Sequence, residues 1–72
     1  MRYEVVYSYD EENGYEEIEG IKGRKFRTYD NALDELVPGQ AVTIKLPDGW
    51  FKEIGIDNDG RRWVQGSKSM EY

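Results

Sequence analysis

The stretch that decides the fold is residues 41–65, AVTIKLPDGWFKEIGIDNDGRRWVQ. Its first residues alternate between apolar and polar side chains, the period-2 pattern of a strand with one buried face. Tight-turn sequences at 47–49 (Pro-Asp-Gly) and 57–60 (Asp-Asn-Asp-Gly) separate this run from a second strand at 50–56 and a third at 61–65. The second half of the chain therefore predicts a three-stranded antiparallel meander.

The N-terminal residues predict a hairpin. Residues 2–10 alternate, with Tyr3, Val5, Tyr7 and Tyr9 on one face. An Asn-Gly pair at 13–14 follows, and both residue types tolerate the positive φ that a hairpin turn needs. We expect residues 15–21 to return antiparallel to the first strand.

Between these parts the spacing of apolar residues becomes helical. Tyr29, Ala32, Leu33 and Leu36 lie at i, i+3, i+4 and i+7. Thr28 or Asp30 can cap the start, and Val37-Pro38-Gly39 ends the helix. A helix of about two turns is marginal by itself, so it should dock against a sheet.

These elements predict an α+β fold that is mostly β. An N-terminal hairpin, one short helix at about 28–37 and the three-stranded meander form a small twisted sheet or barrel. Residues 1–72 make one domain, with a loose tail at 66–72. The expected core comprises Val5, Tyr7, Leu33, Leu36, Val42, Ile44, Ile54 and Val64.

Composition argues against enzyme chemistry. The chain has no His and no Cys, so the commonest general base, a thiol nucleophile and thiolate metal ligands are missing. The acidic turn at 57–60 is not a calcium loop, because Arg61 and Lys68 occupy ligand positions. We expect no enzyme activity, no cofactor and no metal. With no long apolar run and no signal-peptide pattern, we expect a soluble, cytoplasmic protein.

Charge is unevenly distributed. The chain carries 15 acidic and 10 basic side chains, a formal net charge of -5, and residues 1–20 hold seven acids and one base. Four of these acids, Glu11, Glu12, Glu16 and Glu17, lie in the predicted hairpin, which either receives a basic partner or is a solvated tip. The next segment carries Lys22, Arg24, Lys25 and Arg27, which either contact phosphates or pair with the acidic neighbour.

The aromatic residues of the second half are candidates for a binding surface. Trp50 and Phe51 are adjacent in a strand, so both cannot point into one core. Trp50 and Trp63 are interleaved with Lys and Arg, a composition typical of stacking platforms for nucleic acids, although core packing explains it equally well.

Four segments resemble Src homology 3 domains: Val5-Val6-Tyr7-Ser8-Tyr9, Glu35-Leu36 with Gly39-Gln40-Ala41-Val42-Thr43-Ile44, Asp48-Gly49-Trp50-Phe51-Lys52, and Asn58-Asp59-Gly60-Arg61-Arg62-Trp63-Val64. The resemblance implies a small barrel and a groove for proline-rich peptides lined by Tyr7, Tyr9 and Trp50. It also implies that Glu11, Glu12, Glu16 and Glu17 face a basic residue of the peptide. Where that family has Pro-Ser-Asn-Tyr, this chain has Gln65-Gly66-Ser67-Lys68.

Our leading hypothesis is a non-enzymatic interaction module, an adaptor or inhibitor, that is monomeric or weakly dimeric and binds a protein with a basic surface. Its expected binding residues are Tyr7, Tyr9, Glu11, Glu12, Glu16, Glu17, Trp50 and Trp63. One alternative is a small β-barrel that binds nucleic acid through Lys22, Arg24, Lys25 and Arg27, although the nearby acids oppose tight binding. Another is an acidic decoy that mimics DNA.

Overall fold

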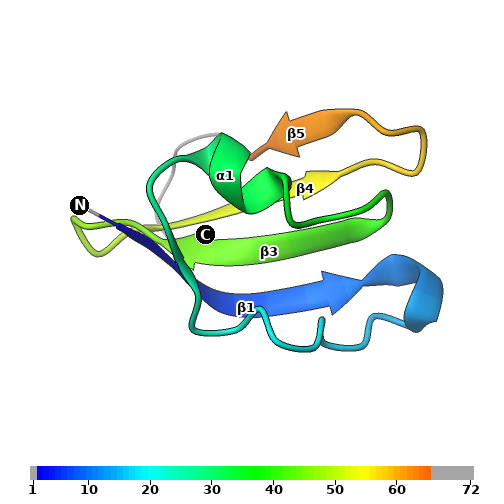
Figure 1. The fold of residues 1–72 in the computed structure, drawn as a ribbon, viewed down its shortest axis with the longest axis horizontal. Coiled ribbons are helices and arrows are strands. Elements are labelled where there is room, and N and C mark those ends of the chain that lie inside the picture. Colours follow the sequence, from blue (N-terminus) through cyan, green and yellow to red (C-terminus); the bar gives the residue numbers. More distant parts are fainter. Residues whose placement is uncertain (1, 66–72) are drawn as a thin grey trace.

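The computed structural model describes residues 2–65, whose strands form one open antiparallel sheet in the order β2-β1-β3-β4-β5. Figure 1 shows β1, β3, β4 and β5 side by side in this order. The elements are β1 (Tyr3–Asp10), the 3-10 helix η1 (Glu11–Asn13), β2 (Lys25–Phe26), α1 (Tyr29–Leu33), β3 (Gln40–Lys45), β4 (Phe51–Ile56) and β5 (Arg62–Val64). The order of strands and helix, the short helix and the meander are confirmed. The tail predicted at 66–72 lies outside the described residues.

The sheet does not close into the barrel that the Src homology 3 resemblance implies. β1 pairs with β3 on one side and with the two-residue β2 on the other, and β5 pairs with β4. The edge strands β2 and β5 therefore lie at opposite sides of the sheet, and both are too short to wrap around and meet.

β1 does have an antiparallel partner that follows it in the chain, but this is β2 rather than residues 15–21. Only an isolated bridge between Asp10 and Glu16 remains of the expected pairing. Gly20 and Gly23 have φ values of 82° and 89°, which no extended strand contains. Beside β1, the Ser8 hydroxyl accepts a hydrogen bond from the N–H of Ile18 at 3.0 Å in place of a regular ladder.

A bulge in β1 overturns the single tyrosine face expected there. Val5 pairs with Ile44, whereas Tyr7 pairs with Thr43, so one extra residue lies between two successive pairs. Directly paired residues share a face of the sheet. Val5 and Ser8 therefore face the core, whereas Tyr7 and Tyr9 lie on the opposite face, and Tyr7 is 58% exposed.

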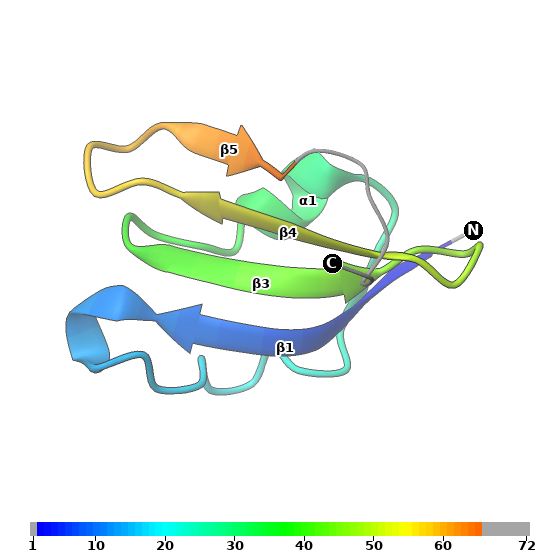
Figure 2. The ribbon, with the colours of Figure 1, turned by 180° about the vertical axis from the view of Figure 1, so that it is seen from behind.

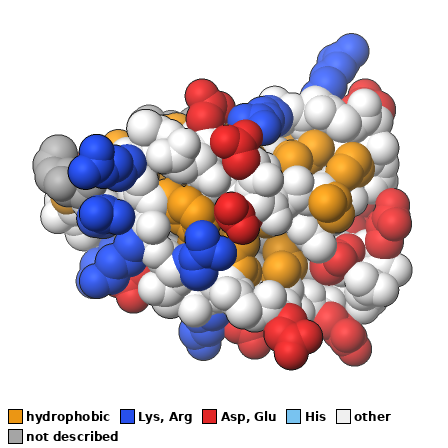
Figure 3. All heavy atoms as spheres, viewed as in Figure 1, with side chains coloured by type: hydrophobic (Ala, Val, Ile, Leu, Met, Phe, Trp, Pro, Cys, Tyr) orange, Lys and Arg blue, Asp and Glu red, His pale blue; other side chains and the backbone are white. Residues whose placement is uncertain are grey.

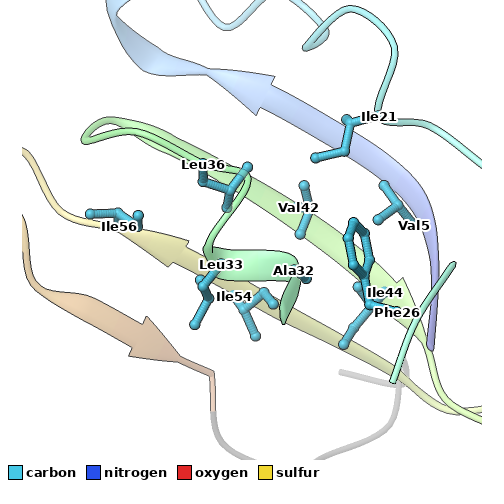
Figure 4. Packing of buried hydrophobic residues seen from close by; sticks show 10 residues of the cluster. All are labelled: Val5, Ile21, Phe26, Ala32, Leu33, Leu36, Val42, Ile44, Ile54 and Ile56. Atoms are coloured by element: carbon cyan, nitrogen blue, oxygen red, sulfur yellow. The ribbon is translucent and has the colours of Figure 1, made fainter. Parts of the chain in front are cut away.

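α1 covers one face of the sheet and carries the core (Figures 1 and 2). The hydroxyl of Thr28 caps it by accepting from the N–H of Asn31 at 3.1 Å. The helix ends at Leu33, earlier than predicted, and turns tightened to i+3 hydrogen bonds bring Leu36 back onto the sheet. Figure 4 shows the buried cluster: Val5, Ile21, Phe26, Ala32, Leu33, Leu36, Val42, Ile44, Ile54 and Ile56.

Six of the eight predicted core residues are buried, and Tyr7 and Val64 are the exceptions. Val64 is 45% exposed because it lies on the edge strand β5, beside a cleft between β5 and α1. Arg62 connects these two elements through Asp34 at 2.7 Å and Asp30 at 3.3 Å. Within residues 2–65, no helix has the length and apolar character needed to span a membrane.

Candidate functional site

The face of the sheet opposite α1 carries no covering helix in the described chain (Figure 2). One row of directly paired residues crosses it: Tyr9 pairs with Ala41, Ala41 with Gly55, and Gly55 with Trp63. The two ends of the row are aromatic and its centre consists of the two smallest side chains. Ala41 and Gly55 are both buried, so the aromatic side chains cover the centre of the row.

The position of the Trp63 indole depends on Gly55. A Cβ at position 55 would lie 2.7 Å from Cζ2 of Trp63 and 2.8 Å from Cβ of Ala41, closer than real side chains allow. The indole of Trp63 can therefore lean over β4 only because residue 55 has no side chain. A glycine inside a strand commonly marks such a close approach.

A cleft of about 530 Å³ lies beside this row, at the end of the sheet next to η1 and the turn between β4 and β5. This volume lies within the usual range for binding pockets. Tyr9 and Trp63 line it together with residues from η1, from the loop before β3 and from the turn between β4 and β5. The lining residues are Tyr9, Glu11, Gly39, Gln40, Ala41, Ile56, Asp57, Asn58, Asp59 and Trp63.

Hydrogen bonds join the three segments that form the rim. The N–H of Glu11 donates to the carbonyl of Gly39, and the N–H of Gly39 donates to the carbonyl of Ile56, both at 2.9 Å. The side-chain amide of Asn58 donates to Oε1 of Glu11 at 3.2 Å. The rim is therefore held together by backbone and side-chain contacts, which preorganises it for binding.

Asp10 holds the base of η1. Its carboxylate accepts hydrogen bonds from the N–H of Glu12 at 3.1 Å, from the amide of Asn13 at 2.9 Å and from the amide of Gln40 at 3.0 Å. These hydrogen bonds lower the pKa of Asp10 below its usual value, and the bond from Gln40 has the largest effect. Asp10 is therefore an anchor of the acidic rim rather than a free ligand group.

The cleft is electronegative. Glu11, Asp57 and Asp59 contribute three carboxylates, and Asp59 forms an ion pair with Arg61 at 3.7 Å. Among residues 2–65, neither Glu11 nor Asp57 forms an ion pair. Burial, together with the charge and hydrogen bond of Glu53, raises the pKa of Tyr9 to about 12.

A second tyrosine extends the aromatic wall. The rings of Tyr9 and Tyr15 lie 5.6 Å apart, centroid to centroid, and the Tyr15 hydroxyl donates to Oε2 of Glu11 at 3.1 Å. Tyr15 has a φ of 65°, unusual for a residue with a side chain. The sequence placed Tyr15 in a second strand, so its role beside the cleft was missed.

The structure brings together three of the predicted binding residues, Tyr9, Glu11 and Trp63, around the cleft. Tyr7 lies on the same face, paired with Thr43. Of the other acids, Glu12 lies beside Gly39, whereas Glu16 and Glu17 are exposed and do not line the cleft.

Trp50 lies elsewhere. It precedes β4, its N–H donates to Asp48 at 3.0 Å, and it is 43% exposed. Its neighbour Phe51 pairs with Lys45, whereas Tyr9 pairs with Ala41, four residues away along β3 or about 13 Å. A groove formed jointly by Tyr7, Tyr9 and Trp50 is therefore not assembled.

The basic segment is partly engaged in local contacts. Arg24 forms an ion pair with Glu35 at 3.4 Å and lies over the ring of Phe26, and Lys25 lies opposite Glu4 in the register of β2 and β1. Lys22 and Arg27 are exposed. Figure 3 shows Lys and Arg side chains concentrated at the left end of the helix face, with Asp and Glu more frequent toward the right and the lower edge.

No family model, curated protein or solved structure matches this chain. A function must therefore be inferred from the chemistry of the cleft and of the surfaces around it.

Proposed function

We propose that this protein is a non-enzymatic interaction module, an adaptor or inhibitor, whose sheet face opposite α1 binds a basic surface of another protein. The observation that carries the proposal is the cleft between Tyr9 and Trp63. It combines accessible aromatic rings with two carboxylates, Glu11 and Asp57, that have no cationic partner among residues 2–65.

Aromatic rings and carboxylates contribute differently to such binding. Rings supply a large contact area with few rotatable bonds, so ordering them on binding costs little entropy. Carboxylates attract a basic partner at long range and speed association. Their location around one cleft supports a single site that uses both effects.

The chemistry of the cleft also favours binding over catalysis. Its lining contains carboxylates, amides, a phenol and an indole, and the chain has neither His nor Cys. An activated nucleophile needs a neighbouring base, and the cleft offers no hydroxyl of Ser or Thr to activate. A proline-rich ligand of the Src homology 3 kind is not part of the proposal, because Trp50 lies away from Tyr9.

Nucleic-acid binding is the second candidate, and one observation favours it. Arg2, Lys25 and Lys45 surround a shallow cleft of about 270 Å³ with Glu4, Leu46 and Pro47. Three cations there could contact phosphates. However, Glu4 lies opposite both Lys25 and Lys45 in the sheet register, and its negative charge beside these two cations disfavours a phosphate.

Affinity capture with paired variants tests the proposal. The variant Glu11→Gln/Asp57→Asn removes two charges from the cleft and keeps hydrogen-bonding capacity, while Glu17→Gln/Glu19→Gln removes two charges elsewhere. We expect a basic protein to be retained by the wild type and the control at low salt, and to be lost with the cleft variant. Equal retention by both variants, or capture of nucleic acid alone, would overturn the proposal.

A further inference from the structure

We infer, on the basis of the proposed function, that the cleft between Tyr9 and Trp63 is an acceptor for one arginine side chain of the partner. The inference follows from the shape of the cleft, from the positions of its carboxylates and from the fixed geometry of its walls.

Two aromatic side chains, Tyr9 and Trp63, line the cleft. Tyr9 and Trp63 stand at the ends of a row whose two central residues are Ala41 and Gly55. The indole of Trp63 already covers Gly55, so the space open to an incoming group lies toward the rim, where Gly39, Gln40 and Asn58 also line the cleft. Cations bind the faces of aromatic rings, with tryptophan the strongest partner and arginine the commonest cation.

The carboxylates lie on two segments of the rim. Glu11 comes from η1, and Asp57 and Asp59 come from the turn between β4 and β5. Each oxygen of Glu11 accepts from a neutral donor, Asn58 or Tyr15, and each keeps a second lone pair for another donor. A guanidinium has five N–H donors arranged in a fork, so it can contact both segments at once.

Arginine fits this site better than lysine. The guanidinium is planar and weakly hydrated, and it stacks on a ring while its edges donate to carboxylates. An ammonium is a compact charge with a tightly held hydration shell, which it must partly lose to lie against a ring. The combination of aromatic rings and carboxylates in one cleft therefore favours the planar cation.

The site is not filled by the chain's own nearest arginine. Arg61 follows the rim turn, yet its side chain is 83% exposed and reaches only Asp59, at 3.7 Å. Arg62 points to the other face of the sheet, where Asp30 and Asp34 of the α1 segment bind it. The described residues thus leave the cleft open for an arginine from outside.

The walls are held in place before binding. The contact of the Tyr9 ring with the Tyr15 ring, 5.6 Å between centroids, supports one wall. The close contact between Trp63 and Gly55 fixes the other. Preorganised walls avoid the entropy cost of ordering side chains at the moment of binding.

Three matched peptides test the inference. They have the form acetyl-Lys-Gly-X-Gly-Lys-amide, in which X is arginine, lysine or the uncharged isostere citrulline. The protein is the full chain with Trp50→Phe, which leaves Trp63 as the single tryptophan. Binding is followed at low ionic strength by tryptophan fluorescence and by calorimetry.

We expect the arginine peptide to change Trp63 fluorescence saturably and to bind about tenfold more tightly than the citrulline peptide, with the lysine peptide between them. Two double variants provide a further comparison. Glu11→Gln/Asp57→Asn should lower the affinity for the arginine peptide toward that for the citrulline peptide, whereas Glu17→Gln/Glu19→Gln should leave it unchanged. Both pairs change only exposed side chains, so they test the site without depending on a core substitution.

The outcomes separate this inference from the proposed function. The inferred arginine site is wrong if all three peptides bind equally without a change in Trp63 fluorescence, or if the lysine peptide binds as tightly as the arginine peptide. In either case the proposed binding of a basic partner still stands. If no peptide binds and affinity capture finds no basic protein, both are wrong.

Discussion

The indole of Trp63 lies directly against the backbone of Gly55, so closely that a Cβ at position 55 would come within 2.7 Å of Cζ2. The two residues belong to adjacent strands, β5 and β4, and pair across the sheet. One wall of the candidate binding cleft is therefore positioned by a residue that has no side chain.

Gly55→Ala should accordingly destabilise the protein by about 1–3 kcal/mol, the usual cost of an extra methyl group in a well-packed site. The added Cβ would also meet Cβ of Ala41 and the carbonyl oxygen of Gln40, each at 2.8 Å. Urea denaturation measures the stability, and near-ultraviolet circular dichroism reports the environment of Trp63.

A double-mutant cycle with Trp63→Leu isolates the indole contribution. The cost of Gly55→Ala should shrink in the Trp63→Leu background without vanishing, because the contacts with Ala41 and Gln40 remain. The same cost in both backgrounds would show that the indole does not rest on Gly55.

Leu36→Ala should cost about 2–5 kcal/mol of unfolding free energy, as for other buried leucines. Leu36 lies beyond the end of α1 but is buried in the core between the helix and the sheet. Its neighbour Val37 is exposed, so Val37→Ala is a matched control that should change stability by less than about 0.5 kcal/mol. An unaltered denaturation midpoint for Leu36→Ala would mean that this segment is not docked.

Deprotonation of the Tyr9 phenol should lower the free energy of unfolding in strongly alkaline solution. Its pKa rises from 10.0 to about 12, first because of burial and then because of Glu53, so folding favours the protonated phenol. This contribution is complete below pH 10 and is lost as the pH rises through 12. Tyr9→Phe should therefore flatten the stability profile over that window, measured by denaturation at each pH.

Glu53→Gln provides the control for this titration. The substitution removes the negative charge beside Tyr9 but leaves the phenol in place, so the pKa of Tyr9 should fall toward its ordinary value while the part due to burial persists. Ultraviolet absorbance of the tyrosinate measures the change. If the titration is the same in both proteins, Glu53 does not act on Tyr9.

Binding kinetics should distinguish the contribution of the acidic residues from that of Trp63. Replacing Glu11, Glu12, Glu16 and Glu17 by Gln should mainly lower the association rate for a basic partner, and the difference should disappear at high salt. Trp63→Ala should instead raise the dissociation rate, with a loss of about 2 kcal/mol or more if Trp63 is an anchor. Trp50→Ala is the matched control, and an equal effect of both tryptophans would move the site away from the cleft.

The second half of the fold was predictable because its signals are local. The turn sequences at 47–49 and 57–60 fix where strands end, and the alternation at 41–46 fixes which residues face inward. The face of Tyr7 was not predictable in this way. It depends on a bulge in β1 that is defined only by pairing with β3, a partner more than 30 residues away.

The candidate site was predicted as separate parts. Tyr9 was named from the Src homology 3 resemblance, Glu11 from the acidic hairpin and that resemblance, and Trp63 from the mixture of aromatic and basic residues around it. Their assembly requires the strand order β1-β3-β4-β5, which brings distant segments together across two small residues. Asp57 and Asp59 were interpreted only as turn residues, because nothing near them in the sequence indicates that Tyr9 and Glu11 lie opposite.

The most direct test of the central claim is a nuclear magnetic resonance titration of the isotope-labelled full chain with the arginine-containing peptide. We expect the largest chemical-shift changes at the backbone amides of Tyr9, Ala41, Gly55 and residues 57–60 and at the indole N–H of Trp63. Changes confined to Arg2, Lys45 and residues 22–27, or to the face covered by α1, would contradict it.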